Sequence, residues 1–219
     1  TVSAIDGDGV TLANGSRISA RTIIDCRGPE ASEHLTGGWQ VFMGRLMRTT
    51  KPHGVERPII MDAAVDQHGD YRFVYVLPLG VNDLFVEDTY YSDSPKLERS
   101  AVSSRIDQYC RRQGWDGEIL GGETGVLPVV TGGKFAAYQA DMRIEGVGVA
   151  GARGGFAHPL TSYTLPFAVD TALSIAEDAL LSGEQLAAFL EARAKRHWNR
   201  TKFYRRLGSM LFGAAKPGL

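Results

Sequence analysis

The alternation of hydrophobic and polar positions predicts a β-sheet in the middle of this chain. Aromatic residues stand at every second position between residues 71 and 77, so Tyr71, Phe73 and Tyr75 share one face of a predicted strand. A turn over residues 78–83 and the apolar run from Leu84 to Val86 predict an antiparallel return strand. Further strands are predicted at residues 4–12 (a hairpin), 21–26, 118–130 and 146–150.

Helical spacing of apolar residues predicts three helices and hence a mixed α and β fold. Ser94-Pro95 is typical of a helix start, and apolar residues continue at helical spacing up to Gly114. A second helix is predicted over residues 165–181, after a glycine-rich turn. A third is predicted over residues 184–212.

Composition places the chain among ordinary globular proteins. Its 219 residues are 43% hydrophobic and 22% charged, and the formal net charge of -1 gives no reason to expect a nucleic-acid partner. Cys26 and Cys110 lack metal-ligand spacing, so we expect no metal site and a reduced, cytoplasmic setting. No apolar run is long enough to span a bilayer. Residues 1–5 resemble the middle of a strand, so we expect a fragment of a longer protein.

The adjacent acids Glu87 and Asp88 are the first candidates for chemistry. They follow an apolar run, and desolvation beside hydrophobic residues raises a carboxyl pKa, so that the protonated group can act as a Brønsted acid. The alternative is an exposed strand that simply runs into an acidic turn. Strand alternation separates the two acids, with Glu87 on the side of Phe85 and Asp88 on the side of Val86.

A glycine-rich turn over residues 149–159 is the second candidate. A strand that enters such a turn before a helix lets backbone N–H groups approach an anionic ligand. The alternative is a plain connecting loop. No GxGxxG motif opens a helix in this chain, so the N-terminal dinucleotide fingerprint is missing.

Basic and aromatic residues alternate in the region from Arg193 to Phe212. Such a helix can lie on an anionic membrane surface. The alternative is an amphipathic helix that packs on a core and leaves its basic face in solvent.

Taken together, the motifs resemble the bacterial lycopene β-cyclases of carotenoid biosynthesis, over nearly the whole chain. The segments that carry the resemblance are Ile23–Pro29, Pro58–Gln67, Tyr71–Leu79, Phe85–Asp93, Glu123–Pro128 and Gly151–Tyr163. The resemblance implies an FAD/NAD(P)-binding flavoprotein fold of the aromatic-hydroxylase type with a substrate-binding β-sheet. It further implies these regions: 1–30 and 136–182 in the FAD-binding domain, 31–135 in the substrate-binding sheet, and 183–219 as a basic helical segment.

The resemblance implies a reaction without net redox change. Acid-initiated cyclisation of each linear end of lycopene, or of other linear carotenoids, would give γ-carotene and then β-carotene. Reduced FAD would be the cofactor and NAD(P)H its reductant. The protein would work in the bacterial cytoplasm, in peripheral association with the cytoplasmic membrane.

The resemblance also implies roles for individual residues. Residues 85–89 match a Phe-Leu-Glu-Glu-Thr motif of plant members, which makes Glu87 the expected acid and Asp88 the second catalytic candidate. Glu123 is a candidate for assisting proton removal. The expected cofactor contacts are Arg27, Gly28, Pro29, Gly151, Gly154, Gly155, His158 and Pro159. The expected substrate contacts are Tyr71, Phe73, Tyr75 and Phe85.

Two alternative functions remain open at this point. One is a flavin-dependent monooxygenase or other oxidoreductase with the same fold. The other is a non-catalytic, membrane-associated lipid-binding fragment. The isolated chain is expected to be inactive, because the dinucleotide-binding half is missing from it.

Overall fold

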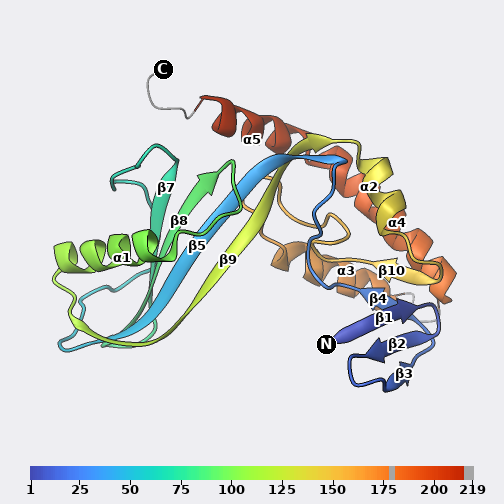
Figure 1. Ribbon diagram of the computed structural model, residues 1–219, viewed down its shortest axis with the longest axis horizontal. Coiled ribbons are helices and arrows are strands. Elements are labelled where there is room, and N and C mark those ends of the chain that lie inside the picture. Colours follow the sequence, from blue (N-terminus) through green and yellow to red (C-terminus); the bar gives the residue numbers. More distant parts are fainter. Residues whose placement is uncertain (178–180, 215–219) are drawn as a thin grey trace. The chain divides into compact units, whose positions relative to one another are not determined.

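The computed structural model describes residues 1–177 and 181–214, which form two compact units (Figure 1). The first unit combines residues 1–36 with residues 130–209. The second combines residues 37–129 with the chain from Met210 onward.

The first unit contains two small sheets and helices. Strands β1 (Val2–Asp6), β2 (Gly9–Leu12) and β3 (Arg17–Ser19) form an antiparallel sheet. Asp6 pairs with Gly9 across the first turn, which confirms the predicted hairpin. Strands β4 (Ile23–Asp25) and β10 (Val147–Val149) pair in parallel. The helices of this unit are α2 (Phe135–Met142), α3 (Leu165–Glu177) and α4 (Gly183–Arg200), and α5 (Lys202–Ala214) begins in it.

Helix α4 supplies the main apolar stripe of the first unit. Leu186, Leu190 and Ala194 recur every four residues, so they lie on one face of the helix, and all three are buried. They pack with Phe135 and Tyr138 of α2 in one hydrophobic cluster. This packing fixes α2 and α4 around the parallel pair β4–β10.

The second unit is built on a five-stranded sheet with the order β6-β7-β8-β5-β9. In Figure 1 the long strands β5 and β9 run side by side through this sheet. The strands are β5 (Leu35–Thr49), β6 (Ile59–Asp62), β7 (Arg72–Pro78), β8 (Asp83–Ser92) and β9 (Gly117–Gly133). Strands β7 and β8 are antiparallel, as the sequence predicted.

The two faces of this sheet differ in what covers them. Helix α1 (Arg99–Gln113) packs Val102 and Ile106 against Leu84 and Val86, which forms the larger core of the unit. The opposite face carries an aromatic cluster that includes Phe73, Tyr91 and Val129, with Leu211 and Phe212 of α5 packed against it. We refer to this second face as the aromatic face.

Helix α1 differs from the sequence prediction at its start but not at its end. Helix α1 begins at Arg99 rather than at Ser94-Pro95, because the Ser94 hydroxyl instead accepts a hydrogen bond from the Lys96 N–H at 3.3 Å in a local turn. Its predicted end is confirmed, since Gly114 is the left-handed C-cap with φ 75°.

The predicted helix over residues 184–212 is in fact two helices. Thr201 separates α4 from α5, and its hydroxyl donates to the His197 carbonyl at 2.9 Å. The helix predicted over residues 165–181 is described as far as Glu177, residues 178–180 lie outside the described residues, and Leu181 is not helical. Within residues 1–177 and 181–214, no helix combines the length and apolar character needed to cross a membrane.

We predict that the N-cap of α4 contributes measurably to the stability of the first unit. Ser182 and Gln185 form a reciprocal capping box, in which each side chain accepts from the other residue's backbone N–H. Ser182→Ala should lower the free energy of unfolding by about 1 kcal/mol in chemical denaturation. Ser104→Ala, at an exposed position of α1, is the control. It should change the free energy of unfolding by less than about 0.5 kcal/mol. Equal losses in the two variants would contradict this prediction.

Candidate active site

Strand β8 directs its two acids to opposite sides of the sheet, as predicted. Glu87 lies on the aromatic face, whereas Asp88 lies on the α1 face and is completely buried. In the ladder, Glu87 pairs with Tyr75 of β7 and with Gly44 of β5. The acids therefore occupy different environments although they are adjacent in sequence.

Glu87 is a partly buried carboxyl group with one hydrogen bond. Its Oε1 accepts from the Thr89 hydroxyl at 2.8 Å, along the same face of β8. Burial raises the pKa of Glu87, and the negative charges of Glu123 and Asp88 act in the same direction, while the Thr89 bond opposes them. Within the described chain, Glu87 forms no ion pair. The pKa of Glu87 is thereby shifted toward the neutral, proton-carrying form.

Aromatic rings and a glycine surround this carboxyl. A Cβ on Gly44 would lie 2.2 Å from the Phe85 ring, so the ring occupies the space that a side chain at residue 44 would fill. A Cβ on Gly125 of β9 would similarly lie 2.3 Å from the Phe42 ring. The ends of two phenylalanine rings thus fill the spaces beside these glycines and make this part of the aromatic face apolar.

The predicted substrate contacts divide by burial. Phe73 is only 1% exposed and sits inside the aromatic cluster, with ring centroids 5.7 Å from Tyr71 and 5.2 Å from Tyr75. Tyr71, Tyr75 and Phe85 are partly exposed on the same face. The structure thus brings the four residues together on the side of Glu87, with Phe73 as a packed member of the floor.

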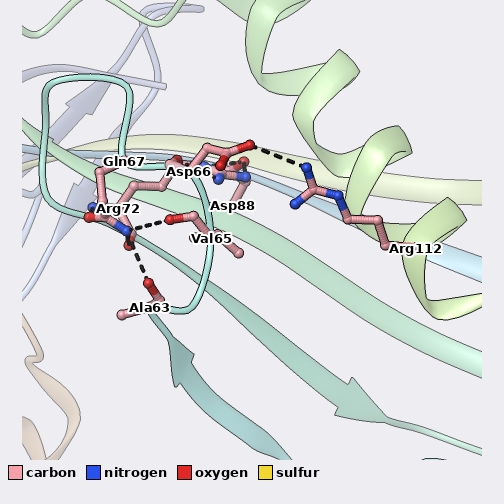
Figure 2. A network of polar contacts seen from close by, with 7 residues as sticks. All are labelled: Ala63, Val65, Asp66, Gln67, Arg72, Asp88 and Arg112. Atoms are coloured by element: carbon pink, nitrogen blue, oxygen red, sulfur yellow. Dashed lines mark hydrogen bonds and ion pairs between the residues drawn. The ribbon is translucent and has the colours of Figure 1, made fainter.

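Asp88 is paired with an equally buried arginine (Figure 2). The Arg72 Nη2 donates to Asp88 Oδ2 at 2.5 Å and its Nε to Oδ1 at 2.9 Å, and Arg72 is 3% exposed. Such a geometry satisfies both charges at once. Asp88 was the second catalytic candidate, and the structure places it in a closed ion pair beneath the sheet, away from Glu87.

A loop before β7 completes the hydrogen bonding of Arg72. The Gln67 side chain accepts from the Arg72 backbone N–H and donates to the Arg72 carbonyl, both at 2.9 Å. The Asp66 carbonyl accepts from Arg72 Nη1 at 3.0 Å, and the Asp66 carboxylate pairs with Arg112 of α1 (Figure 2). The network connects the loop at residues 66–67 with β7 and α1 around the Arg72 guanidinium, whose charge Asp88 neutralises.

The predicted cofactor contacts meet at one edge in the first unit. Strands β4 and β10 are parallel, so their carboxyl ends lie together, and ligands bind outside such ends in open α/β sheets. Arg27 and Gly28 follow β4, while Gly151 and Gly154 follow β10.

An ion-pair cluster holds this edge together. Asp25, 1% exposed, accepts from Arg27 Nε at 2.9 Å and Nη2 at 2.8 Å, and these bonds lower the pKa of Asp25. The Nε of Arg153 lies 3.6 Å from Asp25 Oδ2, and Arg153 also pairs with Glu30. Arg153 Nε is a buried atom without a hydrogen-bond partner within the described chain.

The donor set at this edge suits a polar, anionic group. Gly28 and Gly151 adopt positive φ angles of 95° and 61°, and a Cβ on Gly28 would meet nothing within 4 Å. Backbone can therefore approach a ligand closely there, with the Arg153 guanidinium alongside. Gly154 and Gly155 serve packing instead, since a Cβ would strike the Val149 carbonyl or the Phe135 ring at 2.7 Å.

His158 and Pro159 belong to the loop that leads to α3. The His158 Nδ1 accepts from the Leu160 N–H at 3.3 Å, and its ring centroid lies 4.6 Å from that of Tyr204. Burial lowers the pKa of His158, so its neutral form is favoured. Pro159 is buried, whereas Pro29 is exposed. The histidine organises its own loop through these bonds.

Several residues of these sites were not singled out in the sequence. Asp25 and Arg153 lie far apart in the chain, and only the parallel pairing of β4 with β10 joins them. A carboxylate at the end of the apolar segment Ile23-Ile24 was the available signal for Asp25, which is buried on the same side as Ile23. Strand period does place Thr89 on the side of Glu87, but the hydrogen bond between them was not predicted.

We predict that breaking the buried pair is far more damaging than breaking an exposed one. Asp88→Ala leaves the Arg72 charge buried without its partner, which should lower the free energy of unfolding by about 3–5 kcal/mol. Asp83→Ala breaks the solvent-exposed pair with Arg48 and should cost less than about 1 kcal/mol in the same denaturation experiment. Similar losses in both variants would show that the Arg72–Asp88 pair does not support the fold.

We also predict that Glu87→Gln stabilises the protein at neutral pH. A carboxyl group whose pKa is raised in the folded state binds its proton more tightly there than in the unfolded chain. Its contribution to stability is therefore present at low pH and is lost as the pH rises through the folded-state pKa. The melting temperature of Glu87→Gln should exceed that of the wild type at pH 7–8, and the difference should shrink toward pH 4. A difference that does not vary with pH would contradict the raised pKa.

A solved structure shows that this fold occurs elsewhere. A geranylgeranyl bacteriochlorophyll reductase-like protein from Thermoplasma acidophilum matches 96% of this chain and 56% of its own, with a TM-score of 0.58 and 14% identity. This likeness confirms the fold class expected from the sequence.

Three relatives that are more similar in sequence are all lycopene beta-cyclases. The lycopene beta-cyclases of Pseudescherichia vulneris and of Paracoccus sp. are each 40% identical to this chain, over 217 and 220 residues. The matches cover 99% of this chain and 56% of each relative, so the chain spans about half the length of these curated relatives. The family model described as lycopene cyclase protein matches residues 1–218, and the chain therefore belongs to the lycopene cyclase family.

Proposed function

We propose that this chain carries the acid-bearing part of a lycopene β-cyclase. The observation that carries the proposal is Glu87, a partly buried carboxyl group with a raised pKa on an apolar, aromatic sheet face. The names of the 36–40% identical relatives supply the substrate class, the linear carotenoid lycopene. The products would be γ-carotene, with one β-ionone ring, and β-carotene, with two.

A hydrocarbon substrate explains why the acid must be neutral. Lycopene offers no polar group for an ionised side chain to bind, so the reaction starts when an acid protonates the terminal trisubstituted alkene. The resulting tertiary cation is attacked by a neighbouring alkene, and loss of a proton completes the ring. Glu87 is placed to donate the first proton because its neutral form is favoured where it lies.

The aromatic face suits both the substrate and the cation. Tyr75 lies beside Glu87 in the ladder, and the Phe85 ring lies over Gly44 on its other side. The faces of aromatic rings attract a cation electrostatically. A polyene end on this floor would replace water next to the acid.

We further propose that the β4–β10 edge contributes to an FAD site. Gly28, Gly151 and Arg153 would hold polar parts of the cofactor, with Asp25 and Arg27 keeping the edge rigid. His158 and Pro159 would shape the loop beside it. Bound and reduced, FAD would supply negative charge that stabilises a cation, with NAD(P)H as the reductant.

The proposed regions of the chain follow from these two sites. Residues 1–30 and 136–182 would belong to this cofactor domain, residues 31–135 to the substrate sheet, and residues 183–219 to a C-terminal segment.

Helix α5 supports a proposal of peripheral membrane contact. Phe203 and Met210 are 69% and 64% exposed, and Lys202 and Arg206 are exposed on the same helix. This combination suits the surface of an anionic bilayer, from which a carotenoid would be drawn. The bacterial cytoplasmic membrane would be that surface.

The proposed function is tested by colour and by product analysis. The full-length protein, expressed in bacteria that make lycopene, should convert it to β-carotene. Glu87→Gln keeps the shape of the side chain but removes the transferable proton, and should lower ring formation by about 10²–10⁴-fold. Glu118→Gln, at the exposed start of β9, is the matched control and should keep wild-type yield.

Other outcomes would identify the alternatives. Product formed with stoichiometric consumption of NAD(P)H and oxygen would indicate a flavin-dependent monooxygenase. Binding to vesicles with unchanged lycopene, in the presence of reduced FAD, would indicate a membrane-associated lipid-binding protein. A Glu87→Gln variant with wild-type β-carotene yield would remove Glu87 from the reaction.

A further inference from the structure

A row of four residues crosses the aromatic face at the level of Glu87. Three of them are fixed by the strand register: Tyr75 on β7, Glu87 on β8 and Gly44 on β5. Gly44 has no side chain, and the end of the Phe85 ring occupies the space that one would fill. Between the two acids the row therefore presents an apolar ring edge and no polar side chain.

Strand β9 supplies the fourth member, Glu123. Gly117 lies against Arg48, and Gly125 lies against Phe42, so β9 runs antiparallel to β5, its neighbour in the sheet. Two residues before Gly125, Glu123 then stands beside Gly44. Both acids thus flank the same glycine from neighbouring strands.

Independent contacts place Glu123 on the aromatic face. The Thr124 hydroxyl accepts from Arg99 of α1 at 3.1 Å, so Thr124 faces the helix side of the sheet. Strand alternation directs Glu123 to the other side, where Val129 of the same strand joins the aromatic cluster. The electrostatic effect of Glu123 on Glu87 agrees with this placement.

The two carboxyl groups differ in their contact with water. Glu87 is partly buried and bonded to Thr89, whereas Glu123 is exposed. Their Cα atoms are two strand spacings apart, about 9.5 Å, with only Gly44 between them. A substrate end above Gly44 would lie between a desolvated acid and a solvated carboxylate.

We propose that Glu123 is the catalytic base that removes the last proton in the proposed cyclisation, as the partner of Glu87. This inference rests on the proposed function. Glu87 gives its proton to the terminal alkene carbon, and the neighbouring alkene then forms the new C–C bond to the cation. A C–H bond of the ring breaks, its electron pair becomes the ring double bond, and the proton passes to the Glu123 carboxylate. Return of that proton from Glu123 to Glu87 restores both groups, so neither electrons nor protons are consumed.

The assignment separates the effects of the two acids on the product. Without Glu87 no cation forms, so lycopene stays linear. Without Glu123 the cation still forms and closes, but its proton must be lost to another acceptor. Glu123→Gln should therefore slow β-ring formation by about 10²-fold and raise the share of rings with the double bond in another position.

The test uses the full-length protein with lycopene in vesicles and reduced FAD, and it compares Glu123→Gln with Glu118→Gln. Glu118→Gln, on the same strand, should match the wild type in rate and in ring isomers. Glu123→Ala should regain part of its rate when formate is added, because residue 123 is exposed and a small carboxylate can reach it. A merely structural role for Glu123 would produce neither the isomer shift nor the rescue.

Two results would overturn different parts of the argument. If the wild-type protein forms β-rings, and Glu123→Gln equals Glu118→Gln in rate and isomers, Glu123 is not the base. If the wild-type protein leaves lycopene unchanged, the proposed function itself is wrong. The first result leaves Glu87 and the cyclase proposal intact.

Discussion

The two-residue repeat of β8 is the constraint on which the second unit depends. It places one carboxylate in the core beneath the sheet and the next on the aromatic face above it. Beneath the sheet, Arg72 pairs with the Asp88 carboxylate and also donates to the Asp66 carbonyl, so Asp88 is compatible with a packed core. Above it, the described residues give Glu87 one hydrogen bond and no ion-pair partner, and burial raises its pKa. Neighbouring residues of one strand thus lie in a paired, buried environment and in an unpaired, apolar one.

Local patterns in the sequence were sufficient for the strands and for the division of the acidic pair. Aromatic alternation at residues 71–77 and the acids after Val86 both follow from strand period, which needs only neighbouring residues. Boundaries that depend on competing local bonds were predicted less well. The start of α1 and the break at Thr201 were missed because side-chain hydroxyl groups bond to nearby backbone at both places.

Relationships between distant segments could not be derived from local pattern. Gly44 and Glu123 lie far apart in the chain, and only the adjacency of β5 and β9 brings them to one row. The same holds for Asp25 and Arg153, which meet because β4 and β10 pair in parallel. In both units the residues that share a site come from strands separated by long connections. The resemblance to a known family assigned such residues to a common site, but it did not predict which of them are in contact.

The cost of ionising the partly buried Glu87 affects which substitutions can stabilise this sheet. A carboxyl group whose pKa is raised by burial destabilises the fold when it ionises, so selection for thermal stability alone would favour its loss. Substitutions that strengthen the core around Asp88 lie on the opposite face of the same strand and leave that cost unchanged. Substitutions on the α1 face can therefore strengthen the sheet while the acid on the aromatic face is retained.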